Sequence, residues 1–239
     1  MQRREFSISA AALAATAGLT SNTAHAQGQQ PKEGVDYLTL DKPAPTEAAA
    51  GKIEVVEFFW YSCPHCNRFE PQLEEWAKKM PKDVVLRRAP VAFRPDFEAQ
   101  QRLYFVLEAM NKVDELHKKV FHAIHVEKQA LNTLSLIADW VEKQGIDKAK
   151  FTEAYNSFPV ATKSRKATLL QDAYKVDGVP ALGVAGKYYT SGSVAQTMER
   201  ALVVTDHLVG VVRTSMRDGK PAPQPAVKAA PKPAPVKAQ

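Results

Sequence analysis

The sequence has 239 residues, of which 45% are hydrophobic and 24% are charged, the balance of a soluble globular protein. Its net charge of +6 suggests a nucleic-acid partner only until the charge is located along the chain. Residues 1–26 contribute +1 and residues 220–239 contribute +4, which leaves +1 for the body of the protein. A basic face that binds nucleic acid is therefore not expected.

The first 26 residues have the pattern of an export signal. A positive start at Arg3 and Arg4 precedes a short apolar stretch at residues 8–19, and Ala24-His25-Ala26 matches an A-x-A cleavage site. The arginine pair fits a bacterial twin-arginine signal, and an ordinary secretory signal fits equally well. Because the apolar stretch is too short and dilute for a lasting anchor, we expect a periplasmic protein without a stable membrane anchor.

Strand and helix patterns follow the signal. Residues 27–52 read as an N-terminal extension with a first strand at residues 35–40. The run IEVVEFFW, residues 53–60, is typical of a strand covered on both faces. Apolar residues at three- and four-residue steps predict a helix over residues 64–80, and a second strand-like run follows at residues 83–93.

The middle of the chain is almost wholly helical in pattern. Between residues 97 and 174, apolar stripes with helical spacing are divided into several short helices. The breaks lie near residues 112–114, 128–133 and 145–147. Strand and hairpin chemistry returns at residues 176–192, and a last helix is expected over residues 194–216.

This order of elements predicts one α/β domain rather than two independent ones. The domain spans residues 53–219 and carries a helical insertion at about residues 96–171. Residues 220–239, rich in Pro, Ala and Lys, cannot bury a core, so we expect a disordered, extended tail. A passive solvated tail is favoured over one that touches anionic envelope polymer.

The only two cysteines, Cys63 and Cys66, enclose Pro64 and His65. A structural disulfide stabilises mainly by closing a long loop, and this pair closes almost nothing. At the junction of a strand and a helix, the first N–H groups and the dipole of the helix would stabilise the thiolate of Cys63. Pro64 is tolerated there because the first helical position needs no backbone donor. We therefore expect Cys63 to exchange with a partner and Cys66, one turn deeper, to resolve.

His65 adds a second influence on Cys63. Its imidazolium, or a donor from its ring, can stabilise the Cys63 thiolate further. A stabilised thiolate makes the disulfide a better oxidant, by roughly 30 mV for each unit by which the thiol pKa falls. The pair is therefore expected to donate its disulfide rather than to reduce the disulfides of others.

A zinc site is the alternative use of such a pair, and it requires four ligands. There is no second cysteine pair. His117, His122 and His125 lie on a predicted helix among charged residues, where a solvated polar face is the ordinary explanation. We expect neither a metal nor another cofactor.

Two further positions stand out from the pattern. Glu57 lies in the middle of the hydrophobic run, where it is either a buried acid that exchanges protons with Cys66 or an exposed residue of an edge strand; Glu54, near the strand start, is expected to reach water. Val179-Pro180 lies between a helix and a strand, where it is either a cis bond that turns the Val179 backbone toward a peptide or a plain loop proline.

Together, VVEFFWYSCPHCNRFEP and GVPALGVAGKYYTSG resemble the DsbA family of periplasmic thiol:disulfide oxidases over about residues 35–216. The resemblance implies a thioredoxin-like fold with an inserted helical domain. It also implies that Cys63 attacks, Cys66 resolves, His65 tunes and Pro180, after Val179, is the cis-proline beside them; Glu57 matches the buried acid of the family. DsbA is itself the standard example of a strongly oxidising cysteine pair, so this agreement is not independent.

The resemblance also implies partners. Members of the family pass their disulfide to newly exported, unfolded proteins that contain cysteines, and a quinone-linked membrane oxidase of the DsbB type reoxidises them. We expect a monomer. The alternatives are a disulfide isomerase or reductase, for which residues 27–52 are too short to form a dimerisation domain, and a peptide-binding chaperone that works without turnover.

Overall fold

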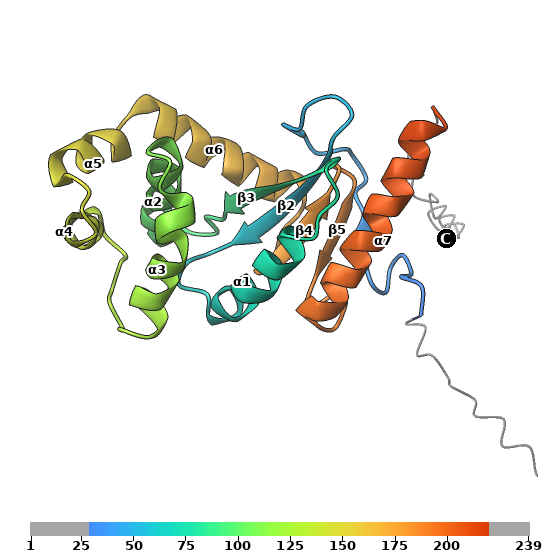
Figure 1. The fold of residues 1–239 in the computed structure, drawn as a ribbon, viewed down its shortest axis with the longest axis horizontal. Coiled ribbons are helices and arrows are strands. Elements are labelled where there is room, and N and C mark those ends of the chain that lie inside the picture. Colours follow the sequence, from blue (N-terminus) through green and yellow to red (C-terminus); the bar gives the residue numbers. More distant parts are fainter. Residues whose placement is uncertain (1–28, 220–239) are drawn as a thin grey trace, which may run out of the picture. The chain divides into compact units, whose positions relative to one another are not determined.

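A computed structural model describes residues 29–219; the expected signal at residues 1–26 and the expected tail at residues 220–239 lie outside this range. The described residues from Pro31 onward belong to one compact unit (Figure 1). Its strands are β1 (Leu38–Thr39), β2 (Ile53–Phe59), β3 (Val84–Pro90), β4 (Ala181–Val184) and β5 (Tyr188–Ser191). Its helices are α1 (Pro64–Ala77), the 3-10 turn η1 (Pro95–Phe97), α2 (Glu98–Ala109), α3 (Val113–His125), α4 (Leu134–Lys143), α5 (Lys148–Tyr155), α6 (Phe158–Ala173) and α7 (Met198–Arg217).

The sheet is organised around β2, whose seven residues are all buried. The strand order is β1-β5-β4-β2-β3, so β2 has a neighbour on each side. It runs parallel to β3 and antiparallel to β4. The register with β3 places Glu57 opposite Arg88. An acidic residue in a central, fully covered strand thus has a cationic residue beside it.

Side chains that alternate along β2 enter different cores. Ile53 and Val55 pack with apolar residues of α1 and α7, the two helices that cover one face of the sheet. Val56 and Phe58 point the other way and pack with Leu170 at the end of α6 and with residues of the following turn. The predicted strand covered on both faces is confirmed.

The helices α2 to α6 lie between β3 and β4 in the chain and gather to one side of the sheet (Figure 1). They share a core of their own, and Phe59, Cys63 and Cys66 belong to this same apolar cluster. The active-site segment is thus packed between the sheet and the inserted helices. The expected α/β fold with a helical insertion is confirmed.

Helix boundaries follow the capping residues. Thr133, Asp147 and Ser157 accept the N–H groups of Leu136, Lys150 and Val160 at the starts of α4, α5 and α6. The sequence pattern missed the break before Ser157, because the apolar residues on its two sides continue the same spacing.

The first strand and the last helix are shorter than expected. The proposed strand at residues 35–40 is reduced to Leu38–Thr39, because the chain turns at Lys32 to Asp36 and the Asp36 carboxylate pairs with Arg200. Helix α7 begins at Met198 instead of residue 194, where Thr197 caps it. No helix within residues 29–219 combines the length and the apolar character that a membrane crossing needs.

The expectation that Glu54 reaches water was wrong. Glu54 is buried near the start of β2, where the backbone N–H of Glu47 donates to its Oε2 at 2.9 Å and Arg87 lies 3.9 Å from its Oε1. The N-terminal extension covers this end of the strand, which the alternation pattern could not show.

Candidate active site

Cys63 occupies the point where the loop after β2 meets helix α1. It is the N-cap residue of α1, and the backbone N–H of Cys66 donates to its Sγ at 3.4 Å. Pro64 takes the first helical position, as expected, where its missing N–H leaves no partner unsatisfied. The sulfur therefore faces the positive end of the helix.

The pKa values of the two thiols are shifted in opposite directions. A hydrogen bond from the Cys66 thiol, followed by the backbone N–H groups of Cys66 and His65 and the charge of His65, outweighs burial and lowers the pKa of Cys63 to about 6. Burial, followed by the neighbouring Cys63, raises the pKa of Cys66 well above its usual value. Both residues are free thiols in the structure. One cysteine is thus a stable thiolate near neutral pH, and the other holds its proton.

His65 lies at the surface, on the first turn of α1. Arg68, one turn further along, places its Nη2 2.8 Å from His65 Nδ1. In a neutral ring, Nδ1 accepts this hydrogen bond and the ring proton sits on Nε2. Arg68 was not singled out in the sequence; its i+3 spacing from His65 was the available signal.

Val179 and Pro180 meet the cysteines from the other side of the site. Their peptide bond is cis, and Cys63 Sγ lies 3.3 Å from the Val179 carbonyl oxygen, to which it donates when it is protonated. A groove of about 460 Å³ borders this contact. Its lining includes His65, residues 177–180, residues 191–193 and residues 196–198. The backbone before Pro180 thus forms part of the wall against which a partner of Cys63 must lie.

Gln100 of α2 fixes the loop that carries Cys63, and sequence reasoning missed it. The Ser62 backbone N–H donates to its Oε1 at 3.1 Å, and its Nε2 donates to Ser62 Oγ at 2.7 Å and to the Leu131 carbonyl at 2.9 Å. The side chain is buried. A polar residue on a predicted apolar helix face was the only signal in the sequence.

Glu57 is fully buried, which settles whether it is exposed at an edge. Arg88 Nε lies 3.1 Å from Glu57 Oε2, close but not aligned as a hydrogen bond, and neither carboxyl oxygen has a hydrogen-bond partner among the described residues. Burial, followed by the nearby Glu70 carboxylate, raises the pKa of Glu57 to about 8. Glu57 therefore carries a proton at neutral pH, and only its ionised form would raise the pKa of Cys66 further.

Glu70 of α1 shares Arg88 with Glu57. Arg88 Nη2 donates to Glu70 Oε1 at 2.5 Å, and His117 Nε2 lies 3.3 Å from Glu70 Oε2. Burial opposes ionisation of Glu70, but His117 and then Arg88 outweigh it and hold its pKa below the ordinary value. One carboxyl of the pair is thus ionised and the other protonated, which leaves Arg88 with a single compensating charge.

His117 is not part of a solvated face, contrary to expectation. It is buried, it contacts Glu70, and its Nδ1 lies 2.8 Å from the Tyr61 hydroxyl. His125, about two turns further along α3, donates from Nε2 to the Tyr61 backbone carbonyl oxygen at 2.8 Å, so its ring proton lies on Nε2. Within residues 29–219, no three His, Cys, Asp or Glu side chains are grouped to hold a metal ion.

This arrangement supports thiol–disulfide exchange at Cys63. It combines a low-pKa thiol that is 7% exposed, a fully buried partner thiol and a buried protonated carboxyl within one packed segment. An attacking or leaving thiolate is stabilised at one sulfur, and the other sulfur keeps its proton.

Comparisons with known proteins agree with this chemistry. The family model of the DSBA-like thioredoxin domain matches residues 54–203. The thiol:disulfide interchange protein DsbA of Bordetella parapertussis is 43% identical over 203 residues, which cover 84% of this chain and 93% of that protein. The protein of the same name from Pseudomonas aeruginosa is 38% identical over 192 residues, 80% of this chain and 90% of the relative. The crystal structure of Pseudomonas aeruginosa DsbA superposes with a TM-score of 0.74 at 38% identity, covering 78% of this chain and 97% of that one.

Proposed function

The chain belongs to the family of DSBA-like thioredoxin domains and is a protein disulfide oxidoreductase, and from this premise we propose that it acts as an oxidase. In this role it donates a Cys63–Cys66 disulfide to newly exported, unfolded proteins that contain cysteines. The observation that carries the proposal is the contrast between the two thiols, one lowered to a pKa of about 6 and one raised. A stabilised thiolate favours the reduced protein and so makes its disulfide an oxidant.

The exchange proceeds in two balanced steps. A client thiolate attacks Cys63 Sγ, the Cys63–Cys66 bond breaks, and Cys66 leaves as a thiolate that takes up a proton. Glu57, protonated near neutral pH, is the proposed proton source. A second client thiolate then attacks the client sulfur of the mixed disulfide, and Cys63 leaves as a stable thiolate. The client loses two electrons and the protein gains them.

The neighbours of Cys63 have supporting roles in this scheme. His65 and the start of α1 stabilise the departing Cys63 thiolate, and Pro64 sets the first turn. Val179 presents its backbone, and Pro180 holds it beside Cys63, so that an extended client can lie along the groove. Cys66 also resolves a mixed disulfide that fails to proceed.

Turnover needs an oxidant for the reduced pair. We assign this role to a quinone-linked membrane oxidase of the DsbB type, with the periplasm as the compartment and a monomer as the working form. The signal-like pattern of residues 1–26 supports the location. No step requires a cofactor in this chain.

The proposal is tested by trapping. Cys66→Ala protein is first converted to a mixed disulfide between Cys63 and glutathione, and a reduced, unfolded client with a single cysteine is then added. A covalent complex at Cys63 and its absence in Cys63→Ala are expected. The wild-type protein, equilibrated with glutathione, is expected to be more oxidising than a thioredoxin. A potential near that of thioredoxin would favour the reductase alternative.

The chaperone alternative has a separate outcome. If Cys63→Ala abolished disulfide transfer yet still supported the folding of clients to the wild-type extent, the groove rather than the cysteines would carry the function. Restored oxidation by membranes that contain quinone, and not by membranes depleted of it, would support the assigned reoxidation partner.

A further inference from the structure

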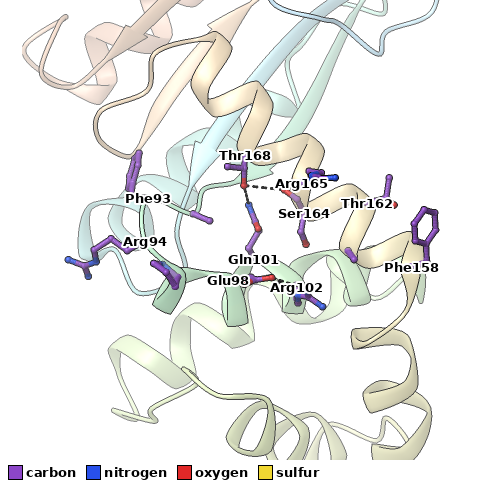
Figure 2. A pocket seen from close by; sticks show the side chains of 13 residues that line it. Phe93, Arg94, Glu98, Gln101, Arg102, Phe158, Thr162, Ser164, Arg165 and Thr168 are labelled. Atoms are coloured by element: carbon purple, nitrogen blue, oxygen red, sulfur yellow. Dashed lines mark hydrogen bonds and ion pairs between the residues drawn. The ribbon is translucent and has the colours of Figure 1, made fainter.

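A second hollow lies between α2 and α6, outside the groove at Val179 (Figure 2). Its volume is about 550 Å³. The segment after β3 closes one end, and one face each of α2 and α6 forms the long walls. We call it the α2–α6 trough. Its lining residues are 92–95, 98, 101, 102, 158, 161, 162, 164, 165 and 168.

Ser164 gives the trough an unsatisfied polar group. The residue is only 4% exposed, and its Oγ has no hydrogen-bond partner among the described residues. Figure 2 shows its side chain directed from α6 toward α2, across the trough. A buried hydroxyl without a partner costs about 1–3 kcal/mol, so such a group calls for an explanation. A bound polar group would supply the missing partner.

The charges around the trough favour an anionic ligand. Arg94 pairs with Asp96, and Arg102 with Glu98, so these two arginines are compensated. Arg165, which also lines the trough, has no carboxylate partner among the described residues. The uncompensated charge of the lining is therefore positive, which favours a carboxylate.

Aromatic side chains mark the two ends. Phe93 and Phe158 stand at opposite ends of the trough in Figure 2, and they are 37% and 82% exposed. A pocket that encloses a small metabolite would bury its aromatic residues, whereas exposed rings at both ends suit a longer ligand that continues beyond the pocket. A trough with an exposed ring at each end thus fits an extended polypeptide.

The trough is linked to the active-site segment. The ring centroids of Phe93 and Phe97 are 5.8 Å apart, and Phe97 stacks on Trp60 with their ring centroids 3.8 Å apart. The Trp60 carbonyl accepts the backbone N–H of Cys63 at 3.0 Å. Because β2 and β3 are parallel, the segments after them leave the same edge of the sheet. A chain that occupies the trough therefore lies against side chains that pack on the active-site segment.

We propose that the α2–α6 trough binds an extended segment of the client polypeptide in which an acidic side chain is flanked by apolar ones. The carboxylate meets Arg165 and the Ser164 hydroxyl, and the apolar neighbours cover Phe93 and Phe158. This second attachment point rests on the proposed function, because it holds the chain whose cysteine reacts at Cys63.

Binding is measured first without chemistry. The probe is a fluorescent dodecapeptide with an Asp between two Phe residues and no cysteine, and the readout is fluorescence anisotropy. Arg165→Glu is expected to weaken binding about tenfold, since it replaces an attraction by a repulsion. Lys166→Glu is the matched control, because it makes the same charge change at the next, exposed residue of α6 outside the trough. Equal losses in both variants would overturn the proposal.

Two further variants separate binding from folding. Ser164→Ala removes the unpartnered hydroxyl. It is therefore expected to raise the melting temperature of the protein and to weaken peptide binding severalfold. Phe158→Ser is expected to weaken binding, whereas Leu169→Ser, at another exposed apolar position of α6 outside the trough, is not. Unchanged binding in both Ser164→Ala and Phe158→Ser would contradict the assignment.

Kinetics distinguish this proposal from the oxidase proposal. With a peptide that carries two cysteines next to the acidic segment, Arg165→Glu is expected to raise KM about tenfold, and a peptide with Lys in place of Asp is expected to erase the difference. Oxidation of dithiothreitol is expected to be equal in wild type and Arg165→Glu. If the protein oxidised dithiothreitol but showed no preference between the peptides, only the proposal for the trough would be overturned. If it bound the peptide but oxidised nothing, only the oxidase proposal would be overturned.

A competition experiment tests a different occupant of the trough. If benzoate displaced the peptide and the Lys and Asp peptides bound alike, a small anion would be the occupant, and the client assignment would be wrong.

Discussion

The ring of His65 is one of several groups that stabilise the Cys63 thiolate, and its charge follows the Cys66 hydrogen bond and the backbone N–H groups in size. His65→Ser is therefore expected to raise the pKa of Cys63 from about 6 by roughly one unit, or ~1.4 kcal/mol. Titration of thiolate absorbance in the reduced protein measures this. Arg68→Ala, which removes only the partner of His65, should move the pKa less. A return to the pKa of a free cysteine in His65→Ser would show that the imidazole, not the helix start, dominates.

Glu57 makes the stability of the oxidised protein depend on pH. Its native pKa of about 8 lies above the ordinary 4.5, mainly because of burial, so the native state holds a proton that the unfolded state has released between these values. Stability is thus fully present below pH 4.5 and is lost as pH rises toward 8, at up to about 1.4 kcal/mol per pH unit.

Glu57→Gln cannot lose this proton. Denaturant unfolding of the oxidised variant between pH 5 and 8 is expected to show a flatter profile than wild type, with the exposed Glu75→Gln as the control. Identical slopes in Glu57→Gln and wild type would mean that Glu57 is ionised in the native state and is not a proton source for Cys66.

At the scale of the elements, α2 fixes the active-site loop through one side chain. Gln100→Ala removes three hydrogen bonds and leaves the Ser62 N–H and the Leu131 carbonyl without this partner. A loss of about 2–4 kcal/mol in unfolding free energy is expected from denaturant titration. Gln100→Glu keeps the acceptor for Ser62 N–H and should lose the two donated bonds only. A Gln100→Ala variant as stable as wild type would show that the loop does not depend on α2.

The elements show what local pattern can and cannot predict. Strand β2 and the inserted helices were predictable, because apolar spacing reflects which face each residue buries. The burial of Glu54 and His117 was not, since it depends on segments far along the chain: the N-terminal extension covers one, and Glu70 and Tyr61 meet the other. Gln100 illustrates the same limit, because its partners are 38 and 31 residues away.

The same distinction between local and long-range contacts applies to the residues of the candidate site. Cys63 and Cys66 could be located from their spacing at a strand–helix junction, since that chemistry is local. The cis bond at Val179-Pro180 and its contact with Cys63 join residues 116 positions apart, and residue physics alone left that bond open until the family resemblance supplied it. The α2–α6 trough had no signal in the sequence, because its walls come from two helices whose packing the apolar stripes do not specify.

At the scale of the whole molecule, the redox state of one cysteine pair is expected to set the stability of the fold. Closing a loop as short as Cys63 to Cys66 contributes only about 2 kcal/mol in the chain-entropy model. Reduction instead gives the native state a thiolate whose pKa of about 6 lies below the ordinary 9.0. That contribution is fully present above pH 9 and is lost as pH falls through 6, and over this range it amounts to on the order of 4 kcal/mol.

The reduced protein is therefore expected to melt at a higher temperature than the oxidised protein at pH 9, and this advantage should vanish at about pH 7.5, where the thiolate contribution falls to the ~2 kcal/mol of the disulfide, and reverse toward pH 6. Cys66 does not cancel the effect, because its thiol is neutral in the native state and, below its ordinary pKa of 9.0, also largely neutral in the unfolded state. Glu57 is present in both redox forms, so its contribution to the pH dependence of stability largely cancels when the two forms are compared. Circular dichroism melts of both forms at pH 6 to 9 measure the difference, and a Cys63→Ser/Cys66→Ser double variant should follow the slope of the oxidised form. An oxidised protein that is more stable at pH 9 would mean that the folded chain favours its disulfide, and the proposed direction of transfer would then be reversed.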